Sequence, residues 1–278
     1  MIRRNLRKEV SLITFLRGNI VKRKIFILLI IVNLVFSSFA NDVLEISNPS
    51  NARNDEYNYL IEHDTFYISY NNSLLIPNWV GWHVDKNDLS SGRHSGIFIT
   101  DDKLPKSWVK VQHKDYSNSG YDRGHLCPNA DRNAYENGKE TFITTNIVPQ
   151  TPECNRGVWK NFEEYCRTIV ENNNYETYIY AGVYGEIGVM SSKNISIPEY
   201  CWKVVIILEE GENDLNRINK DTETISVWIP NNSNCSEKDW EFYIVNIRYI
   251  EDITGYDFLE NTSKDIQDVI ENRTYKMK

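Results

Sequence analysis

Hydrophobic residues in this chain mostly alternate with polar ones or form short runs, a pattern typical of β-strands rather than long helices. On this pattern we expect strands over residues 65–70, 76–84, 96–100, 141–148, 175–184, 202–208, 224–229 and 242–249. Residues 161–171 and 263–270 repeat their apolar positions every three or four residues, which predicts two helices, and residues 250–258 predict a turn. We find no internal repeat and no linker between domains. The pattern therefore predicts a single α+β domain, with a central antiparallel or mixed sheet flanked by helices.

The first 40 residues differ from the rest in charge and hydropathy. An uncharged apolar run at residues 25–36 directly follows Lys22-Arg23-Lys24, and the small residues Ser38 and Ala40 fit a signal-peptidase site. We therefore predict a secretory signal over residues 1–40, cleaved after Ala40, and a secreted or periplasmic protein. An uncleaved membrane anchor is the alternative, although the run is shorter than the ~20 residues that span a bilayer.

Beyond the signal, we expect a polar lead-in at residues 41–54 and one domain over residues 55–278. The chain holds 31 basic and 39 acidic residues, for a net charge of −8, and the part after residue 40 holds 23 basic and 38 acidic residues, for −15. This balance excludes a protein that coats nucleic acid by bulk positive charge. The five cysteines show no Cys-x-x-Cys spacing, which argues against a zinc site.

The residue types that can carry chemistry gather between positions 121 and 167. His125 can accept a proton near neutral pH, and Arg123 lies two residues before it. In an extended segment, residues two apart share a face. A cation beside a proton acceptor suits a substrate that carries and gains negative charge, such as a phosphodiester.

A second group of polar residues is spaced by four, at Asn155, Trp159, Glu163 and Arg167. On a helix these positions form a stripe beside the apolar one. Amide and carboxylate oxygens suit Mg²⁺, which takes few protein ligands and keeps several waters. Together with His125, the stripe predicts metal-assisted hydrolysis of a phosphodiester.

These residues also form a recognisable series of motifs. The run Asp122-Arg123-Gly124-His125 resembles the signature of the DNA/RNA non-specific endonucleases, a family of secreted bacterial nucleases and mitochondrial endonuclease G. The elements at residues 146–150, Asn155, Trp159 and Glu163 match that family in order and spacing. The resemblance implies that residues 55–278 are a nuclease domain with a ββα-metal active-site motif.

The resemblance implies catalytic roles for three of these residues. His125 would be the general base that activates the attacking water, and Asn155 would be the one direct protein ligand of Mg²⁺, with Mn²⁺ or another divalent cation as alternatives. Glu163 would orient a water that belongs to the metal's coordination sphere.

The remaining polar residues would handle the substrate. Arg123 and Arg167 would contact the scissile phosphate, and Asn146 would shape the site near His125. Family members commonly place an arginine shortly before an aromatic-x-x-Asp element, which residues 98–101 match here, but Ile97 and Gly96 precede it. The nearest arginine is Arg93, so its assignment to this role is a departure from the family pattern.

The leading hypothesis is an exported, Mg²⁺-dependent endonuclease that hydrolyses DNA and RNA with little sequence specificity and is strongly inhibited by salt. We expect no stable protein partner, and a homodimer stays open. One alternative is a catalytically silent, nuclease-like binding protein on the cell surface. Another is a phosphodiesterase that acts on small nucleotides.

Overall fold

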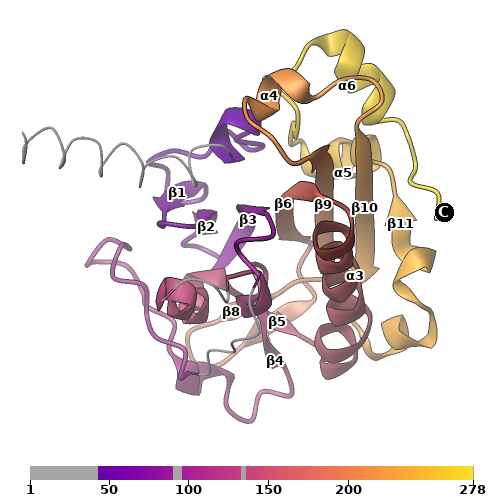
Figure 1. Ribbon diagram of the computed structural model, residues 1–278. Coiled ribbons are helices and arrows are strands. Elements are labelled where there is room, and N and C mark those ends of the chain that lie inside the picture. The colour runs from indigo at the N-terminus through magenta and orange to yellow at the C-terminus, as the bar shows by residue number, and fades with distance from the viewer. Residues whose placement is uncertain (1–42, 90–95, 133–135, 278) are drawn as a thin grey trace, which may run out of the picture.

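The computed structural model describes residues 43–89, 96–132 and 136–277. At its centre is a seven-stranded sheet with the order β1-β2-β3-β6-β9-β10-β11, in which all neighbouring strands are antiparallel (Figure 1). The strands of this sheet are β1 (Tyr59–Glu62), β2 (Tyr67–Asn71), β3 (Ile76–Val84), β6 (Tyr175–Tyr184), β9 (Tyr200–Glu209), β10 (Glu223–Pro230) and β11 (Ile244–Val245). The predicted α+β class is confirmed, and the sheet is antiparallel rather than mixed.

The central strands bury both of their faces. Along β9, Trp202 and Val204 belong to different hydrophobic clusters from Cys201 and Val205, because successive side chains point to opposite sides of a strand. A sheet buried on both faces needs a covering layer on each, and the rest of the chain supplies these two layers.

Helix α3 (Trp159–Asn172) covers the first face and packs against β6 (Figure 1). Its apolar stripe, which includes Phe162 and Ile169, lies in the same cluster as Ile179 of β6. Two small antiparallel sheets complete this layer, namely β4 (Asp122–His125) with β5 (Ile147–Gln150), and β7 (Gly188–Met190) with β8 (Ile195–Ile197). The connections contain the short turns η1 (His113–Tyr116), η2 (Asn129–Arg132), η3 (Glu136–Phe142), η4 (Thr144–Asn146), η6 (Ser233–Glu237) and η7 (Trp240–Tyr243).

The second face is covered by the two ends of the described chain. Helices α4 (Asp214–Arg217), α5 (Ile247–Thr254) and α6 (Lys264–Ile270) lie at the upper end of Figure 1. The N-terminal residues 43–52 pack beside them, and Val43 and Ile46 are each only 1% exposed. The segment that we predicted as a polar lead-in is thus part of the folded domain.

Hydrogen bonds join these two ends across more than two hundred residues of sequence. Ser47 Oγ donates to the Asp257 carbonyl at 2.7 Å, and the Asn48 amide donates to Glu260 at 2.8 Å. Asn261 donates in turn to the Glu45 carbonyl at 2.9 Å. The covering layer of the second face therefore forms only when the first and last parts of the domain meet.

Two predicted strands are wrong. Residues 141–148 mostly form 3-10 turns, because the hydroxyls of Thr141 and Thr144 bond to the carbonyls of Gly138 and Val111 and bend the backbone. Residues 242–249 contain only the short β11, because the Asn246 side chain accepts from the Tyr249 amide and starts helix α5 there.

Residues 96–100, predicted as a strand, make only an isolated bridge at Ile99. The predicted signal, residues 1–40, lies outside the described residues. Among the helices of the described part, none is long and apolar enough to cross a membrane.

Candidate active site

The β4–β5 pair carries the Asp122–His125 motif, with Asp122 opposite Gln150 and His125 opposite Ile147. The Gln150 side chain lies directly over Gly124, where an added Cβ would sit 1.9 Å from the Gln150 Oε1 atom. Only glycine fits at this position, since any side chain would displace Gln150 or separate the strands. The glycine of the motif thus lets the two strands close beneath the site.

Asn146 fixes the turn that follows His125. Its Oδ1 accepts from the Cys127 amide at 2.9 Å, and its Nδ2 donates to the carbonyls of Cys127 at 2.9 Å and Thr141 at 3.0 Å. The Asn146 side chain is fully buried and its polar atoms are paired. Asn146 therefore supports the backbone of the turn beside His125, and its role in the reaction stays a prediction.

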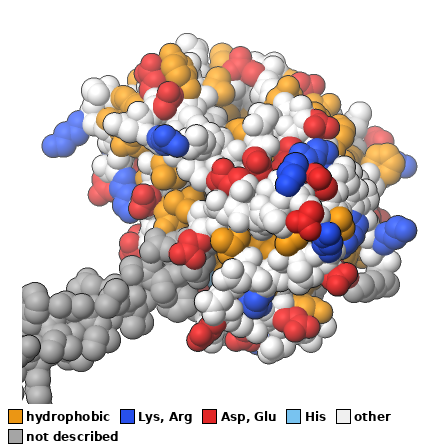
Figure 2. Space-filling view, turned by 90° about the horizontal axis from the view of Figure 1, so that it is seen from above, with side chains coloured by type: hydrophobic (Ala, Val, Ile, Leu, Met, Phe, Trp, Pro, Cys, Tyr) orange, Lys and Arg blue, Asp and Glu red, His pale blue; other side chains and the backbone are white. Residues whose placement is uncertain are grey.

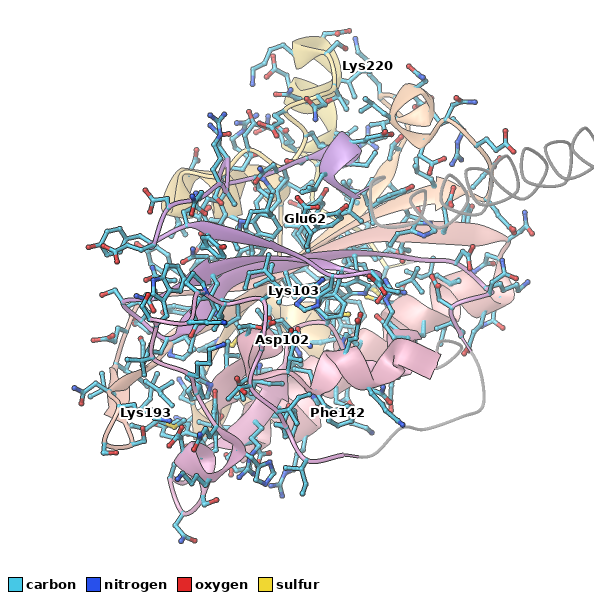
Figure 3. All side chains as sticks on the ribbon, turned by 90° about the vertical axis from the view of Figure 1, so that its left-hand side faces the viewer. Glu62, Asp102, Lys103, Phe142, Lys193 and Lys220 are labelled. Carbon is cyan, nitrogen blue, oxygen red and sulfur yellow. The ribbon has the colours of Figure 1, made fainter. Side chains whose placement is uncertain are left out.

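His125 lies between two aromatic rings. The ring centroids of Phe98 and Phe142 are each 5.1 Å from that of His125, and Figure 3 labels Phe142. Its Nε2 atom is buried and has no hydrogen-bond partner among the described residues. Burial lowers the pKa of His125 to about 4, because the apolar surroundings disfavour the charged ring. At neutral pH the imidazole is therefore uncharged and able to accept a proton.

The aromatic-x-x-Asp element lies beside His125 as well. Phe98 supplies one of the two rings, while the buried Asp101 accepts from the Thr145 hydroxyl at 2.6 Å and pairs with His63 at 3.1 Å. The next residues reach the edge of the main sheet, where the Lys103 ammonium donates to the Glu62 carbonyl (Figure 3). The element thus anchors the wall of the His125 pocket.

Asp122 ties the helical part of the site to strand β4. Arg156 binds its carboxylate with two hydrogen bonds, at 2.5 and 2.6 Å, and the Asn155 Nδ2 atom donates to it at 3.0 Å. Burial alone would raise the pKa of Asp122, but the hydrogen bonds from Arg156 and Asn155 outweigh it, and the pKa lies below its usual value. Because the Asn155 nitrogen faces Asp122, the amide oxygen is left for another partner.

Asn155 belongs to η5 (Cys154–Val158), a π-helical turn directly before α3. Gly157 has non-helical backbone angles there (φ −105°, ψ −108°), so the turn and the helix meet at a kink. π-helical turns inside helices occur frequently at functional sites. Trp159, the first residue of α3, is buried and donates from Nε1 to the His125 carbonyl at 3.3 Å. The kinked turn therefore holds Asn155 close to the strand that carries His125.

Glu163 lies one turn further along α3 and is 11% exposed. Its Oε1 atom is 3.3 Å from the ammonium of Lys203, which lies 4.3 Å from the ring centroid of Trp159. Burial raises the pKa of Glu163, and the charge of Lys203 opposes this shift. The sequence analysis missed Lys203, although a lone lysine on the buried face of strand β9 was a signal for it.

The two arginines assigned to the substrate already have protein partners. Arg167 donates to Asp131 at 2.8 Å, and Asp131 also accepts from the Trp82 indole at 3.0 Å. Arg123 is half-buried and donates to the His113 carbonyl at 2.8 Å. Asp131 was not anticipated, because nothing in its sequence context separates it from a surface residue.

The other basic residues around the site are Arg93, Arg156 and Lys160. Arg93, assigned from the sequence to a substrate role, lies outside the described residues. Arg156 and Lys160 are paired with Asp122 at 2.5 Å and Glu164 at 2.9 Å. The positive charge around the site is therefore largely matched by carboxylates in the described part of the chain.

A family model for DNA/RNA non-specific endonucleases matches residues 45–265. This chain belongs to that family. A nuclease of Nostoc sp. strain PCC 7120 is 40% identical over 234 residues, which cover 83% of this chain and 85% of that protein. The mitochondrial nuclease EXOG of Mus musculus is 26% identical over 237 residues, which cover 76% of this chain and 60% of that protein.

A solved structure has the same fold. A chain in the crystal structure of the EndoG/EndoGI complex superposes with a TM-score of 0.67 at 19% identity, covering 80% of this chain and 92% of that one. As a member of its family, this chain is an endonuclease that hydrolyses nucleic acid, and the family depends on a divalent metal.

The donor set of this endonuclease fits a hard divalent cation. Asn155 presents an amide oxygen, because its nitrogen is engaged by Asp122. Glu163 adds a carboxylate on α3, where its partner Lys203 lies over the Trp159 ring, and carboxylate and amide oxygens are what Mg²⁺ and similar ions bind. The residues that would hold the metal are therefore Asn155 directly and Glu163 through water.

Proposed function

We propose that this endonuclease is exported, depends on Mg²⁺, and cuts both DNA and RNA internally with little sequence specificity. The observation that carries the proposal is the neutral, partly exposed ring of His125 on the strand that Asp122 ties to Asn155. A neutral imidazole is suited to take a proton from a bound water.

In the proposed mechanism, His125, whose ring is partly exposed, removes a proton from the attacking water. The pocket formed by Phe98 and Phe142 keeps the ring neutral until that moment. Asn155 would hold the metal through its amide oxygen, and a bound ion would supply electrostatic stabilisation of the phosphate and of the leaving oxygen. Glu163, which pairs with Lys203, would support the metal through water.

The arginines would bind the phosphate. Arg123 is held by the His113 carbonyl and Arg167 by Asp131, so both guanidinium groups are preorganised before substrate arrives. Contacts with phosphate position a nucleic acid without reading its bases. This accounts for cleavage of DNA and RNA alike.

Export rests on the sequence of residues 1–40, in which a basic cluster, an apolar run and small residues at Ser38 and Ala40 follow one another. Expression in a bacterial host, followed by N-terminal sequencing of the protein from the medium and the periplasm, tests this part. A mature N-terminus at Asn41 is expected, whereas an intact chain recovered from the membrane fraction would favour the anchor.

Digestion of supercoiled plasmid and of RNA by the purified protein tests the activity, with Mg²⁺ or with EDTA. We expect cutting of both substrates only with the metal, and a loss of about 10²- to 10⁴-fold in kcat for His125→Ala. His83→Gln is the matched control, because His83 contacts Glu176 and the Tyr178 ring of the second-face cluster. Absence of cutting with several divalent metals, or cleavage of a chromogenic diester but not of plasmid, would overturn the proposal.

A further inference from the structure

A cluster of three carboxylates lies on the side of the main sheet opposite to His125. Glu251 of α5, Asp257 of the following loop and Glu271 at the end of α6 each offer one oxygen, and these oxygens lie within 4.8 Å of one another. The helices that carry them pack on the second face through residues such as Ile250 and Ile270. The cluster is therefore separate from the catalytic residues on α3 and β4.

Two of the three carboxylates are buried. Glu271 is fully buried and Glu251 is 6% exposed, whereas Asp257 is exposed and opens the cluster to solvent. The Glu271 Oε1 atom has no hydrogen-bond partner among the described residues. Leaving a buried carboxylate oxygen unpaired costs free energy, so a cation beside this atom would stabilise the charged form.

The charges within the cluster do not balance. Arg248 pairs with the Glu251 Oε2 atom at 2.9 Å and also with Glu271, and Lys264 is a second cation that acts on both carboxylates, so two cations face three carboxylates. Burial and repulsion from Glu251 raise the pKa of Glu271 to about 7. The surface at this end of the molecule mixes acidic and basic side chains (Figure 2).

We propose that Glu251, Asp257 and Glu271 form a second divalent-cation site, with a structural role and a preference for Ca²⁺. Ca²⁺ binds oxygens at about 2.3–2.6 Å, so its opposite ligands lie about 4.6–5.2 Å apart, a spacing that this cluster allows. Mg²⁺ binds at about 2.0–2.1 Å, demands near-octahedral geometry and usually keeps several waters, whereas Ca²⁺ accepts flexible geometry and bidentate carboxylates, so three carboxylates from separate segments suit Ca²⁺ better. The bound ion would link α5, the loop after it and the end of α6.

The test uses the Asn155→Ala variant, so that the catalytic metal site does not contribute to the signal. Thermal unfolding is measured with EDTA, 10 mM Ca²⁺ or 10 mM Mg²⁺. If Ca²⁺ is present at about 100 times its Kd, the unfolding equilibrium shifts about 100-fold, which raises the Tm by roughly 5 to 10 °C. A smaller rise is expected with Mg²⁺.

Asp257→Asn is the decisive second substitution. The backbone of Asp257 is held independently of its side chain, by hydrogen bonds to the Pro49 carbonyl and from Ser47 Oγ, so the variant should fold. We expect Asn155→Ala/Asp257→Asn to lose the rise in Tm with Ca²⁺. The control Asn155→Ala/Asp252→Asn should keep it, because Asp252 is an exposed carboxylate on α5, the helix that carries Glu251, and is not one of the three proposed ligands. Glu271→Gln in the Asn155→Ala background should also lose it.

Calorimetric titration with Ca²⁺ gives a second readout. One site is expected in Asn155→Ala and none after Asp257→Asn is added. Two results would overturn the cation site: an equal Ca²⁺-induced rise in Tm with and without the Asp257 carboxylate, or no rise in either variant. The buried charge would then be reduced by a proton that Glu251 and Glu271 share. Equal shifts with Ca²⁺ and Mg²⁺ would overturn the preference for Ca²⁺. In the otherwise wild-type protein, Asp257→Asn should leave Mg²⁺-dependent DNA cleavage unchanged.

Discussion

At the level of single residues, burial affects the His125 base and the Glu163 carboxylate in opposite ways. It lowers the pKa of His125 to about 4 and so favours the neutral, proton-accepting form that the proposed base needs. It raises the pKa of Glu163, which would favour the uncharged form, but Lys203 counteracts that shift. The site therefore needs a buried cation beside Glu163 and an apolar pocket around His125.

The pH dependence of cleavage follows from the first of these shifts. Because His125 is protonated only below about pH 4, we expect kcat/KM to fall as the pH drops through about 4, rather than through the usual histidine value of about 6.5. The measurement is a pH profile between pH 3.5 and 8, with circular dichroism to show that the protein stays folded. A fall in kcat/KM near pH 6.5 would contradict the assignment of the acidic pKa to His125. A fall that disappears in Glu163→Gln would contradict it as well.

The raised pKa of Glu163 predicts that removing Lys203 lowers the free energy of unfolding. Lys203→Met leaves Glu163 buried without its partner, and we expect a loss of about 3–5 kcal/mol in the free energy of unfolding by urea. In the double variant Lys203→Met/Glu163→Gln, most of that loss should be recovered, since no uncompensated charge remains. A loss below about 1 kcal/mol in the single variant would show that the pair is not needed.

At the level of elements, the site depends on one strand and one helix held together by Asp122. Asp122→Ala removes the acceptor for Arg156 and Asn155, so the π-helical turn loses its connection to β4. We expect activity to fall by about 10- to 100-fold, with a weaker apparent affinity for Mg²⁺ and little change in Tm. Glu164→Ala is the control, because Glu164 pairs with Lys160 on the exposed side of α3. Equal activities of the two variants would contradict the role of Asp122.

Strands and helices with a clear period could be predicted from the sequence. The ranges 76–84 and 175–184 match β3 and β6 residue for residue, and residues 161–171 lie within α3. These elements bury a whole apolar face, so local pattern and tertiary packing agree. The strand predicted over residues 141–148 was wrong because the threonine hydroxyls of this segment bond to carbonyls and bend the backbone. The periodicity of the sequence does not reveal such hydrogen bonds.

The sequence predicted those residues of the candidate site that belong to a motif or to a regular spacing. His125, Asn155 and Glu163 stood out by motif and spacing, and the structure brings the elements that carry them together. Lys203 and Asp131 were missed because they come from distant segments, β9 and η2, and act through packing against α3. Such contacts depend on the tertiary fold.

At the level of the whole molecule, the endonuclease must bind a polyanion although the chain carries a net charge of −8. Arg156, Lys160 and Arg167 are paired with carboxylates of the protein, so few cations are available to release counterions from the substrate. With about two or three phosphate contacts, KM for DNA should rise roughly 10- to 40-fold between 50 and 200 mM salt. Steady-state kinetics in NaCl test this, and a flat profile would contradict it.

The hydrogen bonds between residues 45–48 and 257–261 have a consequence for biosynthesis. During translation, the early segment cannot find its place until residues 257–261 have left the ribosome, more than two hundred residues later. Until then, one face of the main sheet lacks its cover and stays exposed. The domain therefore completes its fold only when its last part has been made.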